Sequence, residues 1–206
     1  MVTVQRRLGL NRLSRLEPPR PILRYEHPEP GGLIHLDVKK LGRIGRIGHR
    51  IHGDRRRATR GIGWECVHVA IDDCTRLAYG EVLPLEDGQT TAAFLSRALA
   101  WFASRGIRVR AVLTDNGSGY VSRVFRALIL KRGLRHVRTR PYRPQTNGKA
   151  ERLIRTLLHE WAYAQAYRNS TFRTAALPGY LRYYNHERRH TALGYITPAQ
   201  RLAERL

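Results

Sequence analysis

The order of the predicted strands and helices constrains this chain more than any other feature of its sequence. Segments 64–72 and 76–83 are rich in β-formers, and the three residues at 73–75 between them suit a tight turn, which predicts an antiparallel hairpin. Helical and strand-like segments then alternate, with strands at 107–113 and 134–139. A hairpin followed by alternating helices and strands predicts a mixed sheet covered by helices, hence an α/β fold.

Three further segments complete the predicted architecture. Residues 33–38 form a first strand that ends near Asp37, and residues 39–63 form a basic loop without apolar periodicity. A helix that begins at Thr90 or Thr91, capped by a Thr, carries apolar residues at helical spacing and ends before Gly106. A shorter helix spans 122–131 and ends before Gly133. With its five strands, the predicted sheet is large enough to be the centre of one domain.

The segment 147–161 has the pattern of an amphipathic helix. Its apolar stripe is made of Ala150, Leu153, Ile154, Leu157 and Trp161. Asn147, Glu151 and Arg155 follow one another at four-residue spacing on an adjacent face. One helix can therefore pack its stripe on the sheet and present Glu151 beside it.

The charge of the chain indicates its partner. The 38 Lys and Arg residues against 16 Asp and Glu leave a formal net charge of +22, for which nucleic acid is the default partner. Residues 39–60 hold nine of the basic residues, whereas residues 63–94 hold six acids and one Arg. A generally basic soluble protein is the plain alternative.

The chain suits one sizeable domain with short appendages. We predict a basic, Pro-rich linker at 1–30, a core domain at 31–186 that includes the loop 39–63, and a C-terminal motif and helix at 187–206. Cys66 and Cys74 form no CxxC pattern, and the sequence contains no 18-residue apolar run. These features predict a cytoplasmic protein without a membrane span. We also expect it to be nucleoid-associated in use and to need no small-molecule cofactor.

Two acids stand almost alone in the basic second half. Between Gly88 and His159 there are 15 Lys and Arg residues but only two carboxylates, Asp115 and Glu151, with 35 residues between them. A nucleic acid would repel these carboxylates unless a cation neutralised them. The pair therefore suggests a site for a hard divalent metal beside a polyanion.

Asp37 is the candidate for a third carboxylate. If the strands that lead to Asp37 and Asp115 are neighbours, both side chains project from the same end of the sheet, and Glu151 reaches them from its helix. Three such carboxylates suit Mg²⁺ or Mn²⁺. Two ions roughly 3.5–4 Å apart would activate an attacking oxygen and stabilise a leaving one. For each acid alone, a surface cap or salt bridge is the competing interpretation.

These residues carry a family resemblance. The chain resembles the catalytic core of bacterial insertion-sequence transposases of the retroviral-integrase-like DDE superfamily. The matching blocks span residues 30–202 and are HLDVKKLG, VAIDDCTRLAYGEV, LTDNGSGY, RTRPYRPQTNGKAERLIRTLLHEW and YYNHERRHTALGYITPAQ. The resemblance implies an RNase H-like fold, with Asp37, Asp115 and Glu151 as the acids of a D, D-35-E arrangement that cuts and joins DNA ends in a homo-oligomer.

Several residues near the acids are candidates for DNA contact or support. A phosphate-contacting role is predicted for Lys149 and Arg155 first, then for Arg152, Arg143, Arg140 and Asn147. A solvated basic face or ordinary ion pairs would explain them equally simply. Asn116 either orients Asp115 or serves the Asn-Gly turn. Arg43, Arg46, Arg50, Arg55, Arg56, Arg57 and Arg60 of the loop would attract DNA without reading its sequence, or form a charged insertion. His35 is expected to be a packed or surface histidine outside the site.

A rival motif, HExxH, occurs at residues 186–190. In zinc proteases the two histidines at i and i+4 bind the metal and Glu acts as base. The longer metzincin form fails here because Ile196 stands where a third His is required. The transposase block, in which Thr197 caps a final helix that begins with Pro198, explains the segment better.

The function that follows is a metal-dependent DNA transposase core, which hydrolyses a phosphodiester at an element end and joins the freed 3′-OH to target DNA. Two alternatives stay open. An RNase H-like nuclease would cleave without joining. A catalytically idle DNA-binding remnant of a mobile element would bind DNA in a salt-sensitive way and form no metal-dependent product.

Overall fold

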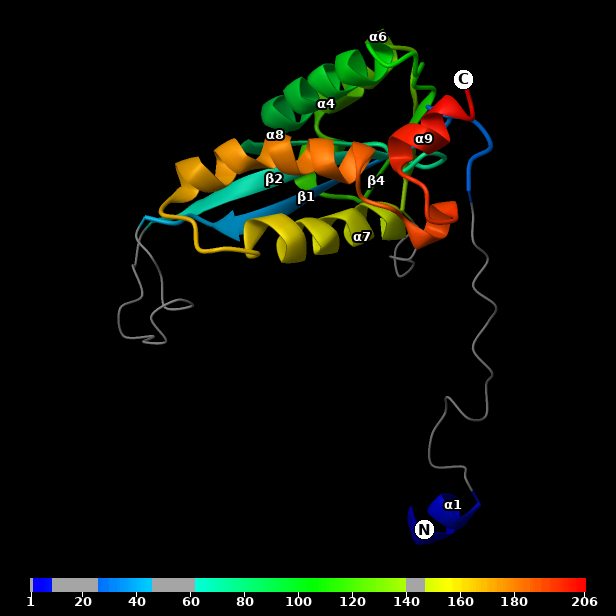
Figure 1. Ribbon diagram of the computed structural model, residues 1–206, viewed down its shortest axis with the longest axis vertical. Helices are drawn as coiled ribbons and strands as arrows, with labels where there is room; N and C mark the ends of the chain where they lie inside the picture. The colour runs from blue at the N-terminus through cyan, green and yellow to red at the C-terminus, as the bar shows by residue number, and fades with distance from the viewer. Residues whose placement is uncertain (1, 9–25, 46–61, 140–146) are drawn as a thin grey trace.

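A five-stranded mixed sheet forms the centre of the molecule (Figure 1). The computed structural model describes residues 2–8, 26–45, 62–139 and 147–206. The strands are β1 (Ile34–Gly42), β2 (Trp64–Asp72), β3 (Ala78–Leu83), β4 (Ala111–Thr114) and β5 (Arg135–Arg138), in the order β3-β2-β1-β4-β5. The first three pair antiparallel, and β1, β4 and β5 are parallel. The predicted hairpin and mixed sheet are confirmed.

Helices cover both faces of this sheet. They are α4 (Gly88–Ala103), α5 (Ser118–Val121), α6 (Arg123–Lys131), α7 (Gly148–Leu157), α8 (Ser170–His186) and α9 (Pro198–Ala203). A further short helix, α1 (Val2–Arg7), lies at the N-terminus and is not one of them. A π-helical turn, η3 (Leu158–Ala162), continues α7, and a 3₁₀ turn, η4 (Thr191–Leu193), precedes α9. Within the described ranges, no helix combines the length and the apolarity that crossing a bilayer would require.

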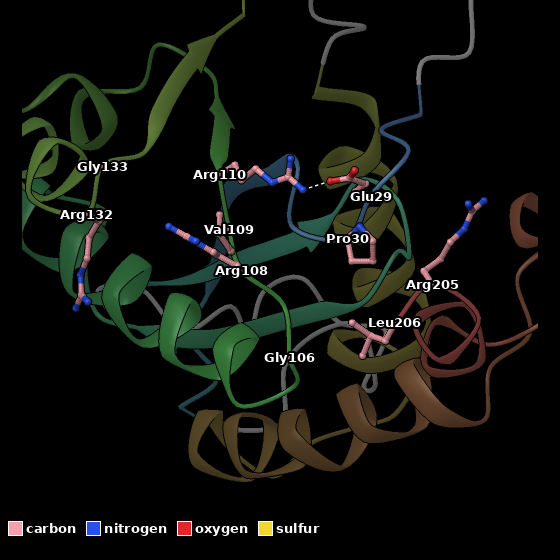
Figure 2. A pocket seen from close by; sticks show the side chains of 10 residues that line it. All are labelled: Glu29, Pro30, Gly106, Arg108, Val109, Arg110, Arg132, Gly133, Arg205 and Leu206. Atoms are coloured by element: carbon pink, nitrogen blue, oxygen red, sulfur yellow. Dashed lines mark ion pairs between the residues drawn. The ribbon is translucent and has the colours of Figure 1, made fainter.

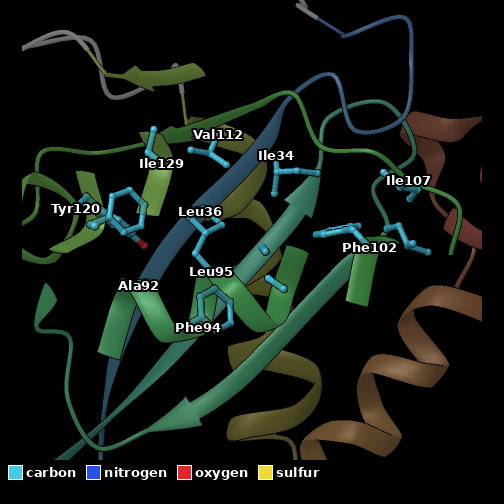
Figure 3. Packing of buried hydrophobic residues seen from close by; sticks show 14 of the residues in the cluster. Ile34, Leu36, Ala92, Phe94, Leu95, Phe102, Ile107, Val112, Tyr120 and Ile129 are labelled. Carbon is cyan, nitrogen blue, oxygen red and sulfur yellow. The ribbon is translucent and has the colours of Figure 1, made fainter. Parts of the chain in front are cut away.

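Strand alternation divides the core into two layers. Ile34 and Leu36 of β1 pack with Phe94, Leu95 and the other buried residues of α4, α5 and α6 on one face (Figure 3). On the opposite face, Leu41 joins the buried side chains of β2, α7 and α8. Because side chains alternate along a strand, His35 and Asp37 belong to the α7 face.

The first strand is longer than its sequence pattern predicts. We expected it to end near Asp37 and residues 39–63 to form a loop, but β1 runs on to Gly42. The reason is tertiary: every residue of β1 pairs with β2, from Ile34 opposite Asp72 to Gly42 opposite Trp64. Asp37 therefore lies inside the strand. Of the residues predicted to form the loop, 46–61 lie outside the described ranges.

The ends of two helices follow their local sequence closely. Gly106 has φ +76° and follows α4, where Ile107 N–H donates to the Phe102 carbonyl and Gly106 N–H to that of Ala103, which is a Schellman motif. Gly133 closes α6 in the same way. The N-cap of α4 was predicted wrongly. Asp87, not a Thr, caps it and accepts from the Thr90 N–H.

Candidate active site

Asp37 and Asp115 lie side by side at one edge of the sheet. In the parallel pair β1–β4, Ile34 is opposite Val112 and His35 opposite Leu113. Two residues further along, the same register brings Asp37 level with Asp115, which directly follows β4. Both lie on the face that carries α7. The prediction that the two strands are neighbours is confirmed, although β1 continues past the point where β4 ends.

The environment of Asp37 disfavours its charged form. The pKa of this carboxyl rises from 3.8 to about 6. Burial is the largest cause, the hydrogen bond from Val38 N–H at 2.8 Å opposes it, and the negative charges of Asp115 and Glu151 add to the rise. The three acids therefore influence one another electrostatically. A cation among them would relieve both the repulsion and the cost of burial.

The turn after β4 fixes Asp115. Gly117 N–H donates to Asp115 Oδ1 at 2.8 Å, and α5 begins at the next residue. Gly119 packs tightly against the start of α4, since a Cβ there would lie 2.5 Å from the carbonyl oxygen of Glu86. The glycines of LTDNGSGY thus let the loop and α5 fold closely behind an exposed carboxylate.

Glu151 comes from the first turn of α7. The predicted stripe, Ala150 to Trp161, is buried against β1 and β2 as expected, and Glu151 is exposed beside it. Among the described residues, no three His, Cys, Asp or Glu side chains converge closely enough to enclose a metal as they stand. Asp115 and Glu151 are exposed to solvent, whereas Asp37 on β1 is half-buried.

Two residues predicted to contact DNA are engaged inside the protein instead. Asn147 is 3% exposed; its amide oxygen faces His35 Nδ1 at 3.1 Å, and its Nδ2 donates to the Leu36 carbonyl at 3.1 Å. Lys149 donates to the carboxylate and the carbonyl of Asp73. These internal contacts account for Asn147 and Lys149 without DNA, and a contact of either residue with DNA stays a prediction. His35 is packed, as expected.

The remaining predicted contacts divide into three groups. Arg152 and Arg155 are exposed on α7, one and four residues after Glu151. Arg140 and Arg143 lie outside the described residues. Asn116 Nδ2 donates to the Thr139 carbonyl at 3.0 Å and connects the ends of β4 and β5, and its predicted role beside Asp115 stays a prediction.

The HExxH segment does not form a zinc-binding helix. The helix α8 ends at His186, and His190 lies beyond it, paired by backbone bridge to Ile196. The two histidines therefore lack the helical i, i+4 relation that the motif requires. Arg188 pairs bidentately with Glu160, Asn185 pairs with both backbone groups of Ala78, and Thr197 forms the predicted cap with Pro198 at the first helical position.

A hollow lies elsewhere, at the edge of the sheet where β4 begins. It measures about 560 Å³ and is lined by Arg108, Arg110, Arg132 and Arg205, with Glu29 paired to Arg110 (Figure 2). Figure 2 shows these arginine side chains pointing in different directions, so they do not converge on one ligand position. The acids stand at the opposite end of β4 and do not line this hollow.

Comparison with known proteins identifies the family of this chain. Residues 27–144, more than half of the chain, match the family profile described as the integrase core domain, and residues 132–198 match a second profile with the same description. The chain belongs to the integrase core domain family. The first match includes β1 and β4, the strands that lead to Asp37 and Asp115, and the second includes α7 of this integrase core.

Solved integrase structures share the fold of this integrase core. A simian T-cell lymphotropic virus intasome in complex with the PP2A regulatory subunit B56 gamma superposes with a TM-score of 0.65 at 19% identity, covering 86% of this chain and 56% of the other. The HTLV-2 integrase catalytic core domain in complex with magnesium, in dimeric form, gives 0.58 at 16% identity, covering 85% and 98%. The RNase H-like fold expected from the resemblance is confirmed.

Curated relatives are similar over part of their length. The ORF3 protein of Spiroplasma virus SpV1-C74 is 27% identical over 145 residues, which is 64% of this chain and 40% of that protein. The Gag-Pro-Pol polyprotein of sheep pulmonary adenomatosis virus is 33% identical over 131 residues, 64% of this chain and 6% of the polyprotein. The integrase core thus spans less than half the length of either relative.

Proposed function

We propose that this integrase core catalyses metal-dependent DNA strand transfer, with Asp37, Asp115 and Glu151 as its catalytic acids. The observation that carries the proposal is the parallel register of β1 and β4, which brings Asp37 level with Asp115 beneath the helix that carries Glu151. The raised pKa of Asp37, due to burial and then to the other two acids, supports a site that needs a cation.

Each acid has a defined part in this proposal. Asp37 and Asp115 would hold Mg²⁺ or Mn²⁺, their carboxylates oriented by the N–H groups of Val38 and Gly117, and Glu151 would complete the set from α7. When bound, two such ions would supply positive charge at the attacking and leaving oxygens of an in-line displacement. The protein contributes fixed oxygen ligands on a rigid edge of the sheet.

The reaction consists of two displacements at phosphorus. In the first, the oxygen of water attacks a phosphodiester at an element end, the P–O3′ bond breaks, and a 3′-OH is released. In the second, that 3′-OH attacks a phosphodiester of the target, forms a new P–O bond and displaces the target's 3′-oxygen, which takes up a proton. Arg152 and Arg155, exposed beside Glu151, would hold phosphates of the reacting strand. A homo-oligomer would present two such sites to two DNA ends.

The test is strand transfer with the isosteric variants Asp115→Asn and Glu151→Gln, assayed with Mn²⁺ and labelled DNA ends. We expect joined product to fall by at least about a thousandfold, because each variant removes a charge that faces the metal. Glu187→Gln is the matched control, since Glu187 is an exposed carboxylate of the HExxH segment, and it should join DNA normally.

Each alternative has its own outcome in this assay. If the protein cleaves DNA without joining it, its function is that of an RNase H-like nuclease and not strand transfer. Salt-sensitive DNA binding with no metal-dependent product would indicate an idle remnant. Unimpaired joining by Asp115→Asn would remove Asp115 from the catalytic set.

A further inference from the structure

A buried polar cluster lies directly behind the proposed acids. It consists of His35 on β1, Asp73 in the β2–β3 turn, and Asn147 and Lys149 at the start of α7. His35 Nε2 lies 2.6 Å from Asp73 Oδ1, His35 Nδ1 lies 3.1 Å from the Asn147 amide oxygen, and Lys149 donates to the same Asp73 oxygen. Three segments far apart in sequence are thereby tied together.

Asp73 is the centre of this cluster. Its side chain is fully buried, and it accepts from three donors: His35, the Lys149 ammonium and the His27 N–H at 2.5 Å. Burial alone would raise the pKa of Asp73, but the hydrogen bonds from His35, Lys149 and His27 hold it below its ordinary value. A buried carboxylate is tolerated only when it is paired in this way.

The turn that carries Asp73 is itself fixed. Asp72 accepts from the Gly31 N–H and from both the N–H and the hydroxyl of Thr75, and Asp73 N–H donates to the Leu33 carbonyl. Asp73 therefore provides a rigid point of attachment for the residues that bind it.

The other ends of the cluster lead to the proposed acids. His35 precedes Asp37 by two residues and lies on the same face of β1. Asn147, the N-cap of α7, stands one helical turn before Glu151 and donates to the Leu36 carbonyl, next to Asp37. The His35 ring lies between an Asp73 carboxylate oxygen and the Asn147 amide oxygen, and so links the turn to the helix start.

We propose that His35, Asp73 and Asn147 are positioning residues, which fix the start of α7 against β1 and so set Glu151 opposite Asp37. The proposal rests on the function proposed above and assigns none of the three a contact with DNA. The ion pair between Lys149 and Asp73 also helps to fix the start of α7. Positioning errors of about 1 Å at such a site cost roughly a hundredfold in rate.

The experiment compares His35→Ala and Asn147→Ala with a control of equal burial far from the acids. The control is Glu65→Gln/Arg173→Met, which removes a buried ion pair of 2.6 Å between β2 and α8. Turnover is measured with Mn²⁺ and DNA ends well below the unfolding temperature of each variant. We expect kcat to fall roughly a hundredfold in the cluster variants with KM for DNA within about threefold, and kcat to be unchanged in the control.

Hydrogen exchange gives a readout that needs no catalysis. In His35→Ala and Asn147→Ala, amides in the first turns of α7 should exchange at least about tenfold faster than in the unmodified protein, while those of α8 stay protected. His35→Gln retains one donor for Asp73 and should recover part of both effects. Should His35→Ala prove unfolded, Asn147→Ala, which leaves the Asp73 pairs intact, carries the test.

The outcomes separate the two proposals. If the unmodified protein joins DNA and Asp115→Asn does not, the proposed function holds. If the cluster variants then match the control in kcat and in α7 exchange, the cluster only adds stability and the positioning role is refuted. If no joining occurs in any form, faster exchange confined to α7 still supports the positioning, and unchanged exchange overturns it.

Discussion

At the scale of single residues, buried titratable groups link this chain's stability to pH. Asp37 carries a pKa raised by burial first and by Asp115 and Glu151 after it, and His190 carries one lowered by burial first and by Arg188 after it. His190 stacks edge-on against Tyr184 at 4.7 Å, and its Nε2 is buried without a hydrogen-bond partner. In each case the charged form is the one that folding disfavours.

Replacing Asp37 should stabilise the metal-free protein. Because the pKa of Asp37 rises from 3.8 to about 6 on folding, the folded state loses stability as pH rises through that interval. At pH 7 and without divalent metal, Asp37→Asn should therefore gain about 1 kcal/mol, or roughly 2–4 °C in Tm. Thermal unfolding in chelator measures this, and a lower Tm for the variant would contradict it.

Replacing His190 should blunt acid sensitivity. Its pKa falls from 6.5 to about 4 on folding, so its contribution is complete above pH 6.5 and is lost as pH falls toward 4. Between pH 7 and 4.5 the unmodified protein should lose about 1–2 kcal/mol more than His190→Phe, a variant that keeps the aromatic contact with Tyr184. Urea unfolding at both pH values provides the comparison, and parallel losses would rule out His190 as the cause.

At the scale of elements, close packing around the loop after β4 holds Asp115 at the edge of the sheet. The helix α5 fits against the start of α4 through Gly119, and Ser122 caps α6 while donating to the Gly119 carbonyl at 2.7 Å. The three helices thus meet at one junction, and the position of the turn that holds Asp115 depends on this packing.

Adding one methyl group at this junction should be costly. Gly119→Ala would place a Cβ 2.5 Å from both the Glu86 carbonyl and the Thr91 hydroxyl, so backbone must shift, and we expect a loss of about 2 kcal/mol. Gly179→Ala is the control, since Gly179 lies in α8 with open space around its Cβ position and should gain roughly 0.5–1 kcal/mol. Chemical denaturation gives the free energy of unfolding of both variants. Equal changes in the two would contradict the prediction.

At the scale of the whole molecule, a net charge of +22 surrounds a small acidic edge. Arg152 and Arg155 are exposed beside that edge on α7, whereas Arg123 and Arg126 are exposed on α6, across the sheet. If DNA is held only by general electrostatic attraction, both pairs of arginines contribute. If DNA phosphates lie at the three acids, only Arg152 and Arg155 contact them.

The salt dependence of DNA binding should distinguish the two pairs. If Arg152 and Arg155 each neutralise a phosphate, Arg152→Gln/Arg155→Gln should flatten the slope of log affinity against log salt by about 2. Arg123→Gln/Arg126→Gln removes the same charge and should change the slope far less. Fluorescence anisotropy across a salt series measures both, and equal slopes would mean that DNA is held by overall charge.

Local sequence determined much of this protein. The hairpin 64–83, the stripe of α7 and the glycines that end α4 and α6 could be predicted because side-chain alternation, helical spacing and positive φ are properties of neighbouring residues. Asp115 and Glu151 could be singled out because carboxylates are rare in that basic segment, and Asp37 because it was expected at the end of a strand. The family resemblance then indicated their chemistry.

Only the tertiary structure decided the rest. The extension of β1 to Gly42 depends on its pairing with β2, and the level placement of Asp37 and Asp115 depends on the β1–β4 register; both join residues remote in sequence. The burial of Asn147 and the attachment of Lys149 to Asp73 were missed because a helical wheel shows which face a residue occupies but not what packs against it. A buried partner, unlike a helical period, leaves no trace in the neighbouring sequence.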